Sequence, residues 1–142
     1  MRFISRRFVA LVIAGLLLPA LAGLALTGGA AGALTGLLWG GLVRVFLVHH
    51  VTWSVNSVCH FLGSRRFETD DQSTNVFWLA LPSLGESWHH NHHAFPRSAV
   101  HGLRRSELDP SALVIGAMER LGLARNVVRI APERQRQRLS DA

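Results

Sequence analysis

Histidines that could bind a metal gather in one short stretch of this sequence. Four of the eight histidines fall within five positions: His89, His90, His92 and His93. Residues three and four apart share one face of an α-helix, so His89, His92 and His93 would project together. Neutral imidazole is a common ligand for iron, zinc, copper and nickel, so the spacing predicts a metal site. It also permits His90 to pair with His93, or a solvated helix end that binds nothing.

The neighbouring residues predict the helix that would carry these histidines. Ser83, with Glu86 three positions later, is typical of a capping box at a helix start. The helix should end before Pro96, because the residue that precedes a proline disfavours helical backbone. The cluster would then lie on a helix between these two signals.

Composition limits the classes of protein to consider. The chain has 142 residues, a net charge of +6 and 49% hydrophobic residues, and its fifteen basic residues are all arginine. The arginines flank apolar segments instead of forming a stripe interleaved with aromatic residues, which argues against nucleic-acid binding. Cys59 is the single cysteine, which excludes an internal disulfide, and we expect it to be a small buried apolar residue.

The first third of the chain predicts a two-helix transmembrane hairpin. No charged residue occurs from Phe8 to Val43, a run too long for one span and suited to two. We expect the helices at 8–26 and 30–48, joined by a turn at 27–29. A secretory signal peptide is the competing interpretation of the first segment. Both ends of the hairpin are rich in arginine, so both termini should be cytoplasmic.

The remainder predicts cytoplasmic helices at 49–130 and a charged, mobile tail at 131–142. Asn56 and His60 lie four residues apart and so share a helical face. The segment 75–81 should form a short helix at the membrane surface. Asp109 before Pro110 predicts the start of a further helix, with an apolar stripe for packing and an end at Gly122. The predicted fold class is an all-α membrane protein: a hairpin followed by a cytoplasmic helical cap that carries a histidine box.

Two motifs together resemble a known family. Asn56-Ser57-x-x-His60-x-x-Gly63, followed by Gly85-Glu86-x-Trp88-His89-x-x-His92-His93-x-Phe95-Pro96, is similar to the C-terminal half of membrane acyl-CoA (stearoyl-CoA-type) fatty acid desaturases. The order and separation of the motifs match that family, as does the hairpin before them. The resemblance extends from about Phe8 to the helix that ends at Gly122.

The resemblance implies a di-iron enzyme that uses O2 and electrons to insert a cis double bond into an acyl chain. It implies four imidazole ligands and a water-mediated contact from Asn56; the imidazoles are those of His60, His89, His92 and His93. His90 stands where the family commonly has Asn, so it should not be a ligand and its removal should have a mild effect. Trp53 would line the acyl region. Glu86 and Asn91 are candidates for orienting the ligand rings.

The sequence also departs from the family pattern. Such desaturases have two earlier histidine boxes, HxxxxH and a first HxxHH, and this sequence has neither. We therefore expect a half-site, inactive alone, in a truncated gene product, a chain with a misplaced start codon or one part of a split enzyme. The implied partners are the lipid bilayer, an acyl-CoA or other acyl substrate, an electron donor of the ferredoxin, cytochrome b5 or reductase type, and a missing N-terminal half. The alternatives are a related hydroxylase or ketolase, and a membrane protein that binds metal without catalysis.

Overall fold

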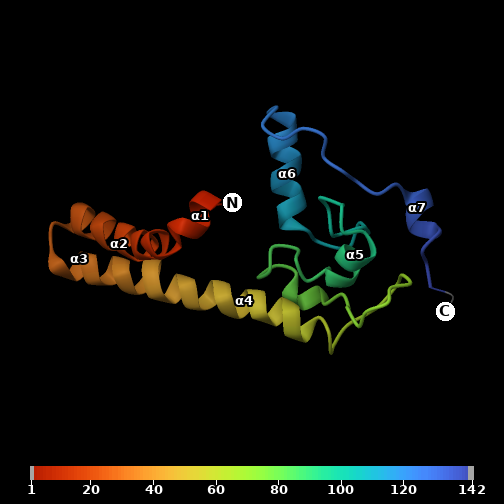
Figure 1. Cartoon of the computed structure of the whole chain (residues 1–142), viewed down its shortest axis with the longest axis horizontal. Helices are drawn as coiled ribbons and strands as arrows, with labels where there is room; N and C mark the ends of the chain where they lie inside the picture. The colour runs from red at the N-terminus through yellow and green to blue at the C-terminus, as the bar shows by residue number, and fades with distance from the viewer. Residues whose placement is uncertain (1, 141–142) are drawn as a thin grey trace. The chain divides into compact units, whose positions relative to one another are not determined.

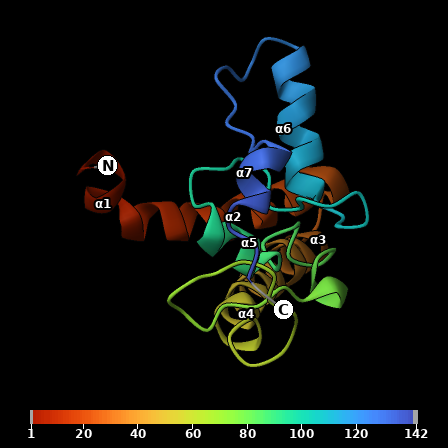
Figure 2. The same ribbon diagram turned by 90° about the vertical axis from the view of Figure 1, so that its right-hand side faces the viewer.

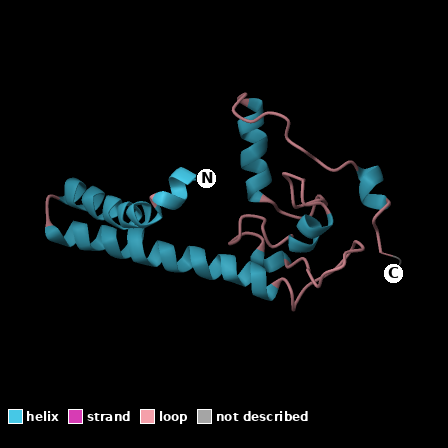
Figure 3. Cartoon of the chain, viewed as in Figure 1, coloured by secondary structure: helices cyan, strands magenta, loops and turns pink. Residues whose placement is uncertain are grey.

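The computed structural model describes residues 2–140, and these form helices and loops without any strand (Figure 3). The chain divides into two compact units between His50 and Val51. The predicted all-α class is therefore confirmed. Helix α4, Arg44–Val58, begins in the first unit and ends in the second (Figure 1).

The first unit is the predicted helical hairpin. It contains α1 (Arg2–Arg6), α2 (Phe8–Thr27), α3 (Ala30–Thr35) and a π-helix, η1 (Gly36–Val43), that continues into α4. Gly28 closes α2 with a left-handed backbone, at φ 70°. Two helices are long and apolar enough to cross a membrane, Phe8–Thr27 and Ala30–Val58. The first helix matches its prediction. The second ends at Val58 instead of 48, because residues 49–58 contain neither proline nor glycine.

Small residues let the two helices of the hairpin approach closely. A side chain on Gly23 would collide with the backbone of Gly32, and one on Gly36 would collide with the carbonyl group of Pro19. Helices without a hydrophobic driving force between them pack through such small residues. The guanidinium of Arg44 adds a polar link, since its Nη2 donates a hydrogen bond of 3.0 Å to the carbonyl oxygen of Gly15.

The second unit has little regular structure around its histidines. Its further helices are a 3₁₀ turn, η2 (Phe77–Leu79), and three α-helices, α5 (His89–Ala94), α6 (Pro110–Arg120) and α7 (Pro132–Arg136). Two small apolar clusters hold it together: Val55, Cys59, Val76 and Leu79, and Phe67, Ala94 and Phe95. Cys59 is fully buried, as predicted, and burial raises the pKa of its thiol to about 11.

The histidine helix begins later than the sequence predicts. Helix α5 starts at His89, and no side chain caps it. The predicted capping box at Ser83 and Glu86 is therefore wrong. The Ser83 hydroxyl instead accepts a hydrogen bond of 3.0 Å from the Ser87 N–H within a series of turns. Gly85 interrupts any helix there, because its φ of 99° lies outside the helical region.

Helix α6 starts and stops where predicted but does not pack as predicted. The Asp109 carboxylate accepts a 2.9 Å hydrogen bond from the Ala112 N–H, and Gly122 follows the helix with φ 73°. However, none of its residues is buried, and Leu113 is 67% exposed. In both views the helix projects away from the rest of the second unit (Figure 2). The predicted packing role of its apolar stripe is thus not seen within this chain.

The C-terminal segment is not the free tail that its charge suggests. Leu139 forms a β-bridge with Phe67, and the Ser140 N–H donates to the carbonyl oxygen of Arg66 at 3.1 Å. The Arg138 guanidinium donates to the carbonyl oxygen of Ala94 at the end of α5. The segment therefore contacts both the loop that contains Phe67 and the C-terminal end of α5.

We predict that Gly36→Leu destabilises the hairpin, by about 1–3 kcal/mol, because its side chain would meet the Pro19 carbonyl group. Thermal unfolding of the purified chain in detergent measures this. Gly29→Ala is the matched control, since a methyl group there meets no atom within 4 Å. Equal melting temperatures for both variants would contradict the close packing.

Candidate metal centre

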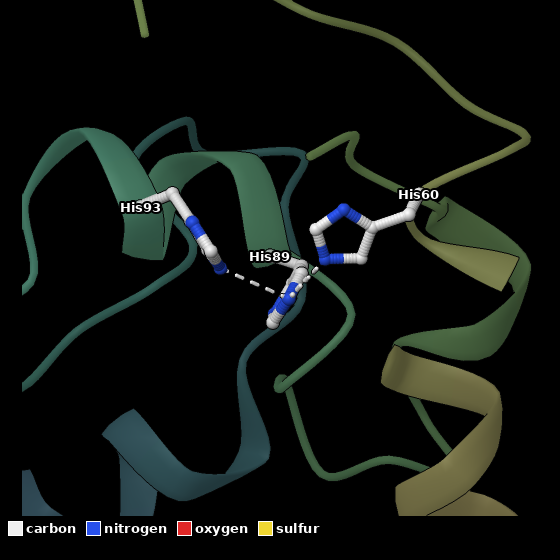
Figure 4. A group of neighbouring side chains, drawn as sticks. All are labelled: His60, His89 and His93. Carbon is white, nitrogen blue, oxygen red and sulfur yellow. Dashed lines mark hydrogen bonds between the residues drawn. The ribbon is translucent and has the colours of Figure 1, made fainter. Parts of the chain in front are cut away.

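Three histidine rings meet in the second unit (Figure 4). The Nε2 atom of His89 lies 3.2 Å from Nε2 of His60 and 3.1 Å from Nε2 of His93. One ring nitrogen from each residue lies within 4.8 Å of the others. His89 and His93 come from one face of α5, as predicted from their spacing, and His60 comes from the turn after α4. The arrangement is a set of imidazole nitrogens directed at one small volume.

Thr74 brings the end of α4 to the start of α5. Its N–H and its hydroxyl both donate to the carbonyl oxygen of Cys59, at 2.7 and 3.0 Å. Its own carbonyl oxygen accepts a hydrogen bond of 3.3 Å from the His90 N–H. One residue therefore joins the neighbour of His60 to the neighbour of His89, which sets the distance between the two imidazoles.

A carboxylate orients His93. The Nδ1 atom of His93 lies 2.6 Å from Oδ2 of Asp71, and Oδ1 of Asp71 accepts a 2.8 Å hydrogen bond from the Ser73 N–H. Burial alone would raise the pKa of Asp71, but the hydrogen bonds from Ser73 and His93 outweigh it and hold this pKa below its usual range. The carboxylate is thus ionised and accepts a hydrogen bond from Nδ1–H of His93, which directs Nε2 of that ring at the cluster.

The environment keeps His89 neutral. Burial and the nearby imidazoles of His93, His60 and His92 lower its pKa to about 4, although Asp71 opposes the shift. An imidazole with such a pKa is unprotonated at neutral pH. That is the form in which histidine binds a metal.

His90 has a structural position. It is fully buried, its Nε2 accepts a 2.9 Å hydrogen bond from the Phe67 N–H, and its Nδ1 lies 3.3 Å from the Ser73 hydroxyl. Both ring nitrogens of His90 are therefore engaged by the protein in this structure. The expectation that its removal has a mild effect on activity stays a prediction, and the contacts add a separate prediction for stability.

His92 lies apart from the three-histidine cluster. Its ring centroid is 6.1 Å from that of His89 and 4.7 Å from that of His101. Burial and His101 lower its pKa, so this imidazole is also neutral. Its Nδ1 atom is buried and has no hydrogen-bond partner among the residues that the structure describes. The two adjacent histidines of the HxxHH motif therefore lie in different places: His93 is part of the three-histidine cluster, and His92 lies beside His101.

The other predicted site residues lie outside the cluster. Asn56 is exposed on α4, where its amide donates to the carbonyl oxygen of Thr52 at 2.9 Å. Trp53 is 59% exposed. The amide of Asn91 binds Asn75, Glu107 and the backbone of His101, and it contacts no ring. Sequence reasoning missed Asp71, because nothing distinguishes it from its neighbours in a charged loop.

Comparison with known proteins agrees with this arrangement of histidines. A family model described as fatty acid desaturase matches residues 1–113. The chain belongs to the fatty acid desaturase family. It is 43% identical to a hex-5-enoyl-[acyl-carrier protein] acetylenase of Moorena producens, over 87% of this chain and 39% of that protein. It is 39% identical to an sn-1 stearoyl-lipid 9-desaturase of Anabaena variabilis, over 94% of this chain and 46% of that protein.

A plant relative is similarly close. The chain is 46% identical to a delta-9 acyl-lipid desaturase 1 of Arabidopsis thaliana, over 77% of its length and 35% of that protein. The chain therefore spans less than half the length of these curated relatives. Family membership accounts for the predicted motif pair, and the suspected resemblance is confirmed.

The residues of the cluster fit a bound metal ion. His60, His89 and His93 each place one ring nitrogen within 4.8 Å of the others, which is the spacing of ligands that share one ion. The Asp71–His93 contact has the form of the carboxylate–histidine pairs that support metal ligands.

We predict that His90→Ala destabilises the second unit, by about 2–4 kcal/mol. The substitution leaves a cavity and removes the acceptor of the buried Phe67 N–H. Chemical denaturation followed by tryptophan fluorescence measures the loss. His49→Ala, at an exposed position of α4, is the matched control. An unchanged denaturation midpoint for His90→Ala would show that His90 does not contribute to the stability of the second unit.

Proposed function

We propose that this chain forms part of a membrane di-iron fatty acid desaturase that inserts a cis double bond into an acyl chain with O2 and electrons. The observation that carries the proposal is the convergence of His60 with His89 and His93, since it unites the two motifs of the family in one cluster. Iron held there would supply the oxidising power to remove hydrogen from an unactivated methylene pair. The protein's part is to hold the metals and to exclude water.

The geometry suggests how the ligands divide. His60, His89 and His93 would hold one iron, and His92 would belong to the second, with Asn56 reaching it through a water. Asp71 keeps the proton of His93 on Nδ1, and burial keeps His89 and His92 neutral. The imidazoles can thus bind two metals without burying more negative charge.

We further propose that the centre is a half-site. Four imidazoles are few for two irons, and the HxxxxH and the first HxxHH boxes are absent from this sequence. The remaining ligands would come from an N-terminal half that is not within these 142 residues. A single hairpin also has too little surface to line a tunnel for a long acyl chain.

The acyl carrier is part of the proposal. The resemblance suggests acyl-CoA, and one relative is named icosanoyl-CoA 5-desaturase. Other relatives carry acyl-lipid or acyl-carrier-protein names. The chemical feature that these names share is an acyl chain. Electrons would come from a donor of the ferredoxin, cytochrome b5 or reductase type.

A metal-binding role without catalysis is the second candidate. The three-histidine cluster is complete within this chain and needs no further box to hold one ion. A related hydroxylase or ketolase would share the same ligands but differ in the outcome. The identity of the product separates these possibilities.

We predict that the chain alone yields no unsaturated product, and that co-expression with a fragment carrying the two missing boxes restores it. In the restored system, His93→Ala reduces the product to background, because it removes a ligand of the cluster. His50→Ala, a histidine on α4 that lies outside the site, is the control and keeps the activity. Gas chromatography of membrane lipids and acyl thioesters, with an electron donor supplied, measures the product and its carrier.

Three outcomes would contradict parts of this proposal. Product from the chain alone, in a host without its own desaturase, would overturn the half-site. A hydroxylated product would favour the hydroxylase, and metal binding without any product in the restored system would favour the non-catalytic protein.

We also propose an integral membrane location with both termini cytoplasmic, since arginines flank both ends of the hairpin. Reporter domains fused to either end should read as cytoplasmic. A reporter that is exported at either end, or cleavage of the first helix as a signal peptide, would overturn this topology.

A further inference from the structure

The two adjacent histidines of the HxxHH motif are supported unequally in the part of the chain that the structure describes. Nδ1 of His93 has Asp71 at 2.6 Å, whereas Nδ1 of His92 is buried without a hydrogen-bond partner. A buried polar atom normally has a partner, because leaving it without one is costly. The side chains next to His92 are therefore the first candidates for that partner.

His101 is the side chain placed to serve. Its ring centroid lies 4.7 Å from that of His92, with an angle of 51° between the planes. Its Nδ1 atom lies 3.9 Å from Oε2 of Glu86, and the His101 side chain is only 17% exposed. The other titratable groups near His92 are His89 and His93, whose rings are directed at the three-histidine cluster.

The fold holds His101 in place through two buried side chains. Its N–H donates to Oδ2 of Asp109 at 2.7 Å, and its carbonyl oxygen accepts from the Asn91 amide at 2.8 Å. Asp109 and Asn91 are 7% and 1% exposed. Asn91 precedes His92 on α5, so the helix that presents His92 also fixes the backbone of His101.

We propose that His101, backed by Glu86, is a positioning residue for His92. Nδ1 of His101 faces Glu86, and after rotation of the His101 ring its Nε2 accepts a hydrogen bond from Nδ1–H of His92. This fixes the tautomer of His92 in which the Nε2 lone pair is free for a metal. His101 therefore orients the ring of His92 in the same way that Asp71 orients the ring of His93. The inference rests on the proposed function, in which His92 is a metal ligand.

The imidazole nitrogens report the tautomer directly. We expect long-range ¹H–¹⁵N spectra of the metal-free full chain in detergent, at neutral pH, to show His92 in one tautomer with the proton on Nδ1. His101→Phe keeps a ring at this position but removes the acceptor, so His92 should become a mixture of both tautomers. His101→Gln restores an acceptor and should return His92 to the single tautomer. Glu86→Gln should give an intermediate mixture.

The spectra contain their own control for folding. The His93 signals depend on Asp71, so they should stay unchanged in His101→Phe, and Asp71→Asn should alter His93 while leaving His92 as it was. A wild-type His92 protonated on Nε2, or a His92 that ignores His101→Phe while His93 reports a folded chain, overturns the proposal. The spectra need neither metal nor turnover, so a failure of the proposed desaturase function would appear separately in the product assay.

Discussion

The centre depends on the hydrogen bonds that Thr74 makes to the two ends it joins. Its N–H and hydroxyl hold the carbonyl of Cys59, and its carbonyl holds the N–H of His90. The six-residue α5 could not place its histidines alone, because a short isolated helix is marginally stable in water, and His60 lies beyond the end of α4. The polar links around Thr74 convert two separate motifs into one cluster. Asn75 adds to them by donating from its amide to the side chain of Asn91.

The site concentrates buried polar groups where an apolar core would ordinarily lie. His90 and Asn91 are almost fully buried within the histidine helix itself, and each is satisfied by neighbouring loops. A buried polar group without a hydrogen bond raises the free energy of the folded state. The loops on either side must therefore follow the backbone path that forms these bonds. The helix therefore has two kinds of residue: those that anchor it through hydrogen bonds, and those whose ring nitrogens remain available to a metal.

The apolar stripe of α6 shows a different constraint. Its N-cap and its end follow local rules, but the face expected to pack is exposed in this chain. Local signals decide where a helix starts and stops, whereas the surface that covers it depends on the rest of the protein. This agrees with a chain that spans less than half of its curated relatives.

The sequence by itself determined the family, the hairpin and the shared face of His89 and His93, because motif order, apolar length and helical spacing are local properties. Only the tertiary structure decided that Asp71 orients His93, that His92 lies beside His101, and that Ser83 and Glu86 do not cap a helix. The first two results depend on contacts between segments that are separated in the chain, where helical spacing carries no information. The third depends on the backbone of Gly85, whose φ of 99° is not helical and cannot be read from the residue spacing.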